Sequence, residues 1–482
     1  MIDPKNMIDP KILERIRSND STLTELDLSH NYIREKGARD LAEALKKNDT
    51  LTRLNLVFAG IGKEGVRNLM GALETRGTLT ELDLSQNSIG DAGAHILAKA
   101  LENNCALAAL TIGESGATLP DTVITDEGVH ALAEALKKND TLTTLGINDG
   151  SIGDECAIAL AAALEKNHTL TTLNLAHTLI GDKGAIALAA ALEKNHTLTE
   201  LDFSCNEIIG DKGVHALAEA LKKNHTLTGL HIWSHKFGDE GAIALAEALK
   251  TNSTLTELDL VLNGITEKGA IALAEALKSN STITVLNLGL IWGWHNIQDE
   301  GVNALAEAII KSGNKNIVEA WPTTDDLKKY CDANKEVVMG LVSKMREKPG
   351  ELTSQDFQDI KDRIPAIIVV LEKEFKFSKK DIAKMLVRVQ AAAASSGITI
   401  EIPEQFKKLA SVGEALPEKP AVSETASPEK PAVSETASRG GIIEKPEKRV
   451  GWSEIIVAPP ETHVGRTETI VSQPETREIG RG

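Results

Sequence analysis

A unit of 28 residues recurs along most of this chain and constrains its fold more than any other feature. Successive copies start 28 residues apart, except for steps of 35 after Leu107 and of 29 after Leu198, and a degraded copy starts near Ile317. A fixed period of this size predicts a solenoid in which each copy packs on the next. The first leucine of the T-L-T-x-L motif in each copy is Leu23, Leu51, Leu79, Leu107, Leu142, Leu170, Leu198, Leu227, Leu255 or Ile283.

Each copy predicts a short strand followed by a helix. In the first copy Leu26 and Leu28 alternate with polar residues, which is typical of a strand with one buried face. After Gly37 the apolar residues recur at helical spacing among strong helix formers. Asn48 is expected to end this helix, since asparagine tolerates the left-handed conformation. The predicted fold class is therefore an α/β solenoid with parallel strands inside and helices outside.

The pattern LxxLxLxxNxI followed by GxxxLAxAL resembles the long leucine-rich repeats seen in ribonuclease inhibitor, over roughly residues 21–321. The family's asparagine is present as Asn31, Asn87, Asn206, Asn263 and Asn296. Other copies carry Ala59, Gly150, Thr178 or His235 there, so any asparagine ladder is expected to be interrupted. The resemblance implies the fold, whereas the function depends on the variable positions.

Changes in composition divide the chain into four parts. Residues 1–20 are expected to form an N-terminal helical cap, and residues 21–321 a solenoid of about 11 repeats. Residues 322–412 predict a small all-α domain, whose core includes Val337 and Phe375 and whose second helix is kinked or delayed by Pro365. Residues 413–482 hold the 11-mer PEKPAVSETAS twice and are rich in Pro, Glu, Ser and Thr, so they are predicted to be disordered. The helices of the all-α domain are predicted at 325–347, 354–375, 378–396 and 403–411.

The formal charge of −17 argues against a nucleic-acid binder and favours a neutral or basic protein partner. The four cysteines are scattered, which indicates a reducing compartment rather than a disulfide framework. No run of about 18 apolar residues predicts a membrane span, and the first 20 residues lack the apolar core of a secretory signal. The expected location is the cytoplasm, or a host cytosol if a bacterium exports the protein without an N-terminal signal peptide.

Strand positions two and four residues after the first leucine are expected to point away from the core, onto a concave face. Several copies carry acidic pairs there, and such a negative stripe would attract a basic partner. The alternative is that E-L-D-L is simply the default of the repeat, kept soluble by its charges. The acidic residues at these positions are Glu25, Asp27, Glu81, Asp83, Glu200, Asp202, Glu257 and Asp259.

Tryptophans gather in the last third of the repeats. Trp233 occupies the next free strand position after His231, and an insertion after Leu288 carries Trp292 and Trp294. Insertions in solenoids often mark the binding face, and tryptophan is enriched in binding hot spots. The alternative is that Trp321 and one insertion tryptophan seal the end of the core. The predicted partner-binding residues are His231, Trp233, Glu257, Asp259, Trp292 and Trp294, with the remaining acidic pairs as a secondary stripe.

Motifs for catalysis or cofactor binding are not found in the sequence, since it has no Gly-rich phosphate loop, HExxH or GxSxG. His168, His196 and His225 occupy one place in consecutive copies, which suits an exposed turn better than a metal site. No metal or cofactor is therefore predicted.

The sequence predicts a non-catalytic scaffold for protein–protein interaction. Its near-identical repeats and tandem 11-mer resemble the repeat effectors that intracellular bacteria deliver into eukaryotic hosts. Two alternatives stand beside it. One is a regulator of a small GTPase, because the repeats are similar to those of the GTPase-activating protein for Ran. The other is an effector ubiquitin ligase. Such ligases carry a catalytic cysteine in a Cys-x-Asp motif, which Tyr330-Cys331-Asp332 resembles, although it lacks the spacing of that motif.

Overall fold

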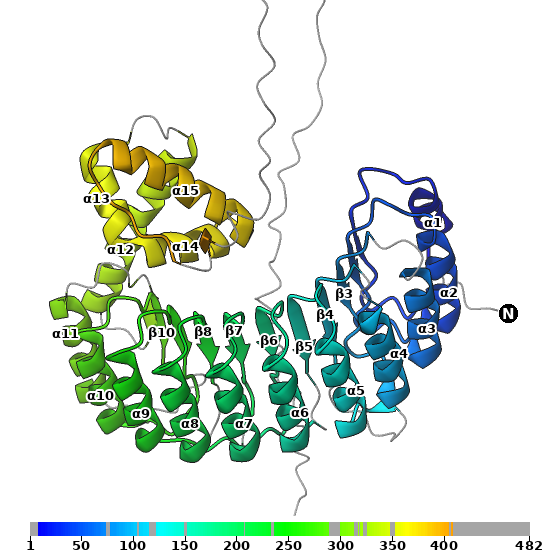
Figure 1. The fold of residues 1–482 in the computed structure, drawn as a ribbon, viewed down its shortest axis with the longest axis horizontal. Helices are drawn as coiled ribbons and strands as arrows, with labels where there is room; N and C mark the ends of the chain where they lie inside the picture. Colours follow the sequence, from blue (N-terminus) through cyan, green and yellow to red (C-terminus); the bar gives the residue numbers. More distant parts are fainter. Residues whose placement is uncertain are drawn as a thin grey trace, which may run out of the picture. The chain divides into compact units, whose positions relative to one another are not determined.

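Residues Met1–Ala415 form one compact unit in the computed structural model (Figure 1). The predicted disordered segment 413–482 lies outside the described residues. The structure describes residues 8–73, 78–103, 106–114, 122–148, 152–206, 208–232, 236–288, 299–312, 317, 319–321, 325–347, 352–403 and 406–407.

Within the described residues, eleven short strands form one sheet in strict chain order. Each strand pairs in parallel with the next at the same repeat position, so that Leu26 faces Leu54 and Leu54 faces Leu82. The degraded copy near Ile317 supplies the last strand, which confirms it as a repeat. The strands are β1 (Glu25–Asp27), β2 (Arg53–Asn55), β3 (Glu81–Asp83), β4 (Ala109–Ile112), β5 (Thr144–Ile147), β6 (Thr172–Asn174), β7 (Glu200–Asp202), β8 (Gly229–His231), β9 (Glu257–Asp259), β10 (Val285–Asn287) and β11 (Glu319–Trp321).

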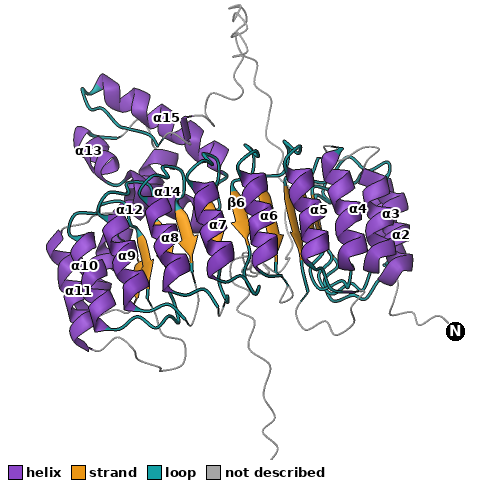
Figure 2. Ribbon diagram, turned by 60° about the horizontal axis from the view of Figure 1, so that its bottom comes forward, coloured by secondary structure: helices purple, strands orange, loops and turns teal. Residues whose placement is uncertain are grey.

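A row of helices covers one face of this sheet (Figure 2). One helix follows each strand from β1 to β10, and α1 precedes the first strand. This arrangement confirms the predicted α/β solenoid. The helices are α1 (Pro10–Arg17), α2 (Arg34–Leu45), α3 (Gly62–Leu73), α4 (Gly90–Glu102), α5 (Asp126–Leu136), α6 (Asp154–Leu164), α7 (Asp182–Leu192), α8 (Asp211–Leu221), α9 (Asp239–Leu249), α10 (Glu267–Leu277) and α11 (Asp299–Ser312).

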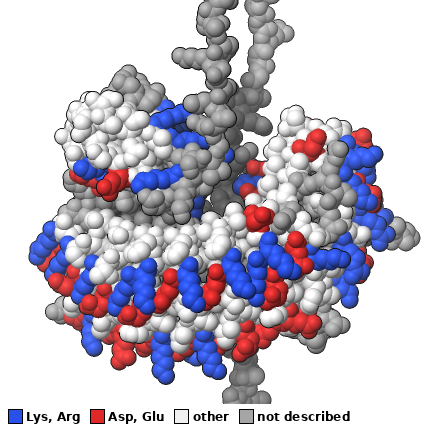
Figure 3. Space-filling model, in the orientation of Figure 1, with Lys and Arg blue, Asp and Glu red and all other residues white. Residues whose placement is uncertain are grey.

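The solenoid core is continuous because each repeat buries its leucines against the next. At one end Leu13 and Ile16 of α1 belong to this core, and at the other end Leu327 and Cys331 belong to it. The outer helical surface carries alternating positive and negative side chains (Figure 3). Some of them join neighbouring repeats, as Lys194 does with Glu165 at 2.7 Å.

Buried asparagines between each helix and the next strand link the repeats. Asn195 donates to the carbonyl of Leu164 at 2.8 Å and accepts the N–H of Leu198 at 2.8 Å. Asn48 belongs to this series and does not adopt the left-handed conformation that asparagine tolerates. Its buried side chain donates to the carbonyl of Ile16 in the preceding segment. The described members are Asn48, Asn139, Asn167, Asn195, Asn224, Asn252 and Asn280.

The family's own asparagine position behaves differently. Asn87, Asn206 and Asn263 are buried and donate to carbonyls of the preceding repeat, whereas Asn31 is exposed. Thr178 replaces asparagine in its copy and donates to Asn206 at 2.5 Å. This ladder is interrupted, as predicted.

An aspartate at the start of one helix also caps the next helix. The Asp182 carboxylate accepts the N–H groups of Gly210 at 2.8 Å and Gly213 at 2.9 Å, at the N-terminus of α8. Free N–H groups at a helix N-terminus need such acceptors, and the helix dipole favours a negative charge there. Asp91, Asp154, Asp211 and Asp239 make the equivalent bonds in their repeats.

A helical region follows the sheet, formed by α12 (Asp325–Glu347), α13 (Ser354–Asp362), α14 (Ile364–Lys373) and α15 (Lys379–Ser395). The predicted helix 354–375 is two helices, because Pro365 starts a new helix at its second position and Arg363 between them is not helical. Val337 is 42% exposed, so its predicted place in the core is wrong. Only Phe406 and Lys407 of the predicted helix 403–411 are described as helical.

The long helix α12 belongs to two cores. Its first turns bury Leu327 and Cys331 in the solenoid core, and its later turns bury Val338 and Leu341 in a second core with α14 and α15. The helical region is therefore continuous with the end of the solenoid.

Candidate interaction surface on the sheet

The sheet face opposite the helices, which we call the sheet face, carries the first and third residues of each strand. The parallel register aligns them into two rows. Glu25, Arg53 and Glu81 lie in the first row, and Asp27 and Asp83 lie in the second. The predicted acidic pairs therefore contribute one residue to each row.

The second row supports the fold. Asp27 accepts the N–H of Ser29 at 2.8 Å, and Asp202 accepts that of Ser204 at 2.7 Å. Asn55 makes the same bond to Val57 at 3.0 Å. Each side chain closes the turn that follows its strand, which is a common use of Asp and Asn. In these copies the bond needs a side-chain oxygen and not a charge, since Asn55 makes it as Asp27 and Asp202 do.

The first row has no such duty in the turn, and its glutamates project into solvent. Side chains of Glu25, Glu81 and Glu200 are 58%, 40% and 47% exposed. Arg53 pairs with Glu25 at 3.3 Å and with Glu81 through two bonds, so the stripe is not uniformly negative. The hydrogen bond to Glu81 raises the pKa of Arg53 above its usual value.

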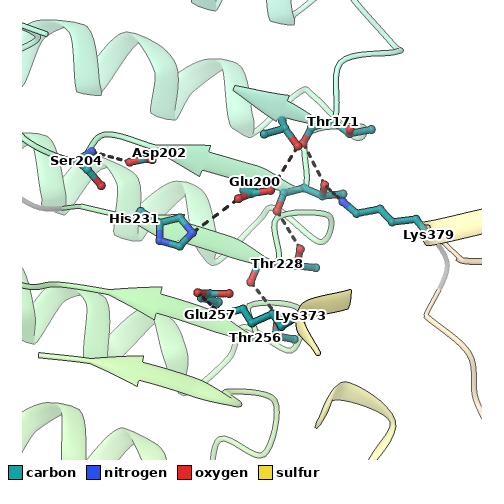
Figure 4. Close-up of polar contacts among 12 residues, drawn as sticks. Thr171, Glu200, Asp202, Ser204, Thr228, His231, Thr256, Glu257, Lys373 and Lys379 are labelled. Atoms are coloured by element: carbon teal, nitrogen blue, oxygen red, sulfur yellow. Dashed lines mark hydrogen bonds and ion pairs between the residues drawn. The ribbon is translucent and has the colours of Figure 1, made fainter. Parts of the chain in front are cut away.

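His231 on β8 is aligned with Asp202 on β7 and with Asp259 on β9. Figure 4 shows its ring next to Glu200 of β7. Its Nε2 is 4.0 Å from Glu200 Oε1. A Cβ at Gly229 would lie 3.5 Å from the same nitrogen, which is an ordinary van der Waals contact. Burial raises the pKa of the Asp259 carboxyl, while the N–H of Val261 and the nearby His231 oppose the shift.

The helical region reaches this part of the sheet face. Lys373 Nζ, at the end of α14, lies 2.7 Å from Glu257 Oε1, and Lys379 Nζ, at the start of α15, donates to Thr199 Oγ at 2.9 Å (Figure 4). We call residues 372–379 the α14–α15 corner. Burial raises the pKa of its Glu372 carboxyl, which the lysines of the corner lower and the glutamates of β7 and β9 raise further.

Seven segments of the chain match a family model described as Leucine Rich repeat: residues 19–42, 47–70, 78–97, 166–189, 194–218, 223–246 and 251–274. These repeats are leucine-rich repeats. No curated protein matches the chain.

Two solved structures are similar to part of this chain. One is leiomodin-1 actin-binding site 2, with 22% identity over 38% of this chain and 88% of that chain, at a TM-score of 0.25. The other is the tropomodulin C-terminal domain of Caenorhabditis elegans, with 21% identity over 33% of this chain and 91% of that chain, at a TM-score of 0.27.

The predicted partner-binding residues divide into two groups. His231, Glu257 and Asp259 lie on adjacent strands of the sheet face. Trp233, Trp292 and Trp294 lie outside the described residues, as does the side chain of Trp321, whose backbone belongs to β11. The structure therefore leaves the tryptophan part of the predicted site as a prediction.

Other candidates occupy simpler positions. His168, His196 and His225 are exposed at their turns. Cys331 is 4% exposed and belongs to the solenoid core. Among the described residues no helix is both long and apolar enough to cross a membrane.

Sequence reasoning missed an aromatic cluster at the other end of the leucine-rich repeats. His30 and Phe58 stack at 5.0 Å between ring centroids, and Tyr32 beside them is 56% exposed. All three have positive φ, which is uncommon for bulky residues. The available signal was the presence of large rings at loop positions where other repeats carry Gln86 or Cys205.

Proposed function

We propose that this chain is a non-catalytic scaffold that binds a protein partner on the sheet face of its leucine-rich repeats. The observation that carries the proposal is the row of exposed glutamates at the first strand position. The turn does not use these glutamates, so they are able to pair with a cation, as Glu25 and Glu81 do with Arg53, whereas the aspartates accept a backbone N–H group.

The partner is expected to present basic side chains to this row. Charges that complement each other across an interface raise the association rate and select the partner. The ion pairs that Arg53 and Lys373 make with its glutamates support this expectation. We also propose that Trp233, Trp292 and Trp294 supply the apolar anchor of the same interface, as tryptophans often do.

The test is affinity capture from a eukaryotic lysate with the full chain as bait. Cutting the chain at residue 321 would expose the solenoid core that Leu327 and Cys331 cover, so no shorter bait is used. Glu81→Lys with Glu200→Lys reverses two charges in the exposed row. Glu134→Lys with Glu247→Lys makes the same change in net charge on the outer helices.

A partner that the wild type and the helix variant retain, and that the sheet variant loses, supports the proposal. Equal retention by all three proteins, with melting temperatures unchanged, rules out the glutamate row as the binding surface. Loss by both variants assigns the capture to net charge alone and also contradicts the proposal.

We further propose, from the near-identical repeats and the tandem 11-mer, that the protein is a bacterial effector that acts in a host cytosol. A reporter that is active only in host cytosol, fused to the chain in its native bacterium, tests this. A signal that depends on the secretion system supports delivery, whereas a signal confined to the bacterium contradicts it.

A further inference from the structure

The α14–α15 corner contacts two strands of the sheet at once. Lys373 reaches Glu257 on β9, and Lys379 reaches Thr199 at the start of β7. Strands two apart in a sheet are separated by about 9–10 Å, so the two ammonium groups span the width of β8 between them. Figure 4 shows both lysines entering from the helical region onto the same part of the sheet face.

The covered part of the sheet differs in exposure from the uncovered part. Thr199 is 6% exposed, whereas Thr52 and Thr143, at the same position in earlier repeats, are exposed. The hydroxyl of Thr199 also donates to the carbonyl of Thr171 at 3.0 Å, like those of its neighbours in the row. The repeat therefore holds the acceptor of Lys379 in place whether or not the corner is docked.

The fit of the corner is imperfect. Lys373 is still 45% exposed and Glu257 22% exposed, and ion pairs this open contribute little. Glu372 is half-buried near Glu200 and Glu257, where like charges oppose one another, and desolvation raises the pKa of its carboxyl. A contact with one weak ion pair and one repulsive carboxylate is suited to reversible release of the corner from the sheet rather than to permanent docking.

We propose, resting on the proposed function, that the α14–α15 corner occupies the partner surface over β7–β9 in place of a lysine-bearing helical segment of the partner. The docked corner and the bound partner exclude each other there. The partner must then offer two ammonium groups spaced to meet Glu257 and Thr199, as the corner does. The uncovered glutamates of β1 and β3 remain accessible in both states.

The docked state is tested first, on the full chain, with a zero-length carbodiimide cross-linker and mass spectrometry. A peptide joining Lys373 to Glu257 is expected. Lys223 and Glu193, which lie 2.9 Å apart on neighbouring repeats, provide the positive control. If the control pair is cross-linked and the Lys373–Glu257 peptide is not found, the corner is not docked and the proposal is wrong.

Exchange is tested with fluorescent oligolysine as the probe. Lys373→Gln with Lys379→Gln frees the surface, and Lys380→Gln with Lys384→Gln removes the same charge elsewhere on α15. The first variant is expected to bind the probe about two- to fivefold more tightly than the second, because an exposed ion pair restrains the corner only that much. Adding Glu257→Gln to the first variant should abolish the gain. Equal binding by the two double variants would overturn the proposal.

The two proposals fail in different ways. If capture shows no partner that depends on the glutamate row, the proposed function is wrong, although cross-linking and oligolysine still report on the corner. If such a partner exists and Lys373→Gln with Lys379→Gln does not strengthen its capture over the Lys380→Gln with Lys384→Gln control, the scaffold stands and the exchange is wrong.

Discussion

Replacing Asn195 by alanine should be among the most damaging single changes on the solenoid. Asn195 is fully buried between α7 and β7. Its amide donates to the carbonyls of Leu164 and Asn167, at 2.8 and 3.2 Å, and its oxygen accepts the N–H groups of Thr197 and Leu198, at 3.0 and 2.8 Å. Alanine removes all of these bonds and supplies no substitute.

The magnitude follows from these bonds. A typical hydrogen bond contributes about 1 kcal/mol net, and a buried group left without a partner costs about 1–3 kcal/mol. Two donated and two accepted bonds then give an expected loss of about 4 kcal/mol, with a range of roughly 3–6. Because repeats contact only their neighbours, the loss is concentrated at the junction between β6 and β7.

Urea unfolding combined with hydrogen exchange measures this effect. Exchange is needed because a long repeat array need not unfold in one step. Asn31→Ala is the matched control, since Asn31 is exposed and donates only to the carbonyl of Ser29 at 3.1 Å; we expect less than about 0.5 kcal/mol. If Asn195→Ala lies within about 1 kcal/mol of the wild type, with no faster exchange at the junction, the buried asparagines do not hold the repeats together.

Three further predictions test the packing, the corner and the sheet face. Gly213→Ala should destabilise the protein by about 1–3 kcal/mol, because the new Cβ would lie 2.9 Å from Asp182 Oδ1. Gly71→Ala should stabilise it by about 0.5–1 kcal/mol, because a Cβ there would have nothing within 4 Å. A lower melting temperature for Gly71→Ala than for Gly213→Ala would contradict this prediction. A double-mutant cycle of Lys373→Gln and Glu257→Gln should give a coupling below about 1 kcal/mol by chemical unfolding, and a larger value would show that the corner is firmly closed. Burial raises the pKa of Asp83, so its charged form costs stability near pH 7, and this cost disappears as the pH falls through the raised pKa. Asp83→Asn should therefore be more stable than the wild type near pH 7, with a difference that closes towards about pH 4 in urea titrations; a difference that widens would refute the sign.

Periodicity made the fold predictable. Alternating leucines set the register of the strands, and a register error would move every leucine to the wrong face. Local signals located α12 and the effect of Pro365, because the start of a helix and the effect of a proline depend on nearby residues. The prediction failed at Val337. This residue lies on a long helix that packs on only one side, and the sequence alone does not fix the rotation of that helix about its axis.

The candidate site was less predictable. The acidic pairs were evident, but the difference between their two members was not, because it depends on a turn that Asp27 closes and Glu25 does not touch. Lys373 and Lys379 could not be assigned, since their contacts join residues 116 and 180 positions apart. The buried asparagines were within reach, as the K-N-x-T-L motif recurs with the period.

Some positions of the repeat are needed for the fold and others are not, and this difference separates the residues that can serve function from those that support the structure. Buried asparagines, capping aspartates and turn aspartates each make the same bond in copy after copy, so their recurrence is explained by the fold. The first strand position makes no such recurring bond and carries Glu25, Arg53, Thr144 or Gly229. A surface that the fold leaves free to vary, and that the chain's own lysine already engages at Glu257, is where selection for a partner can act.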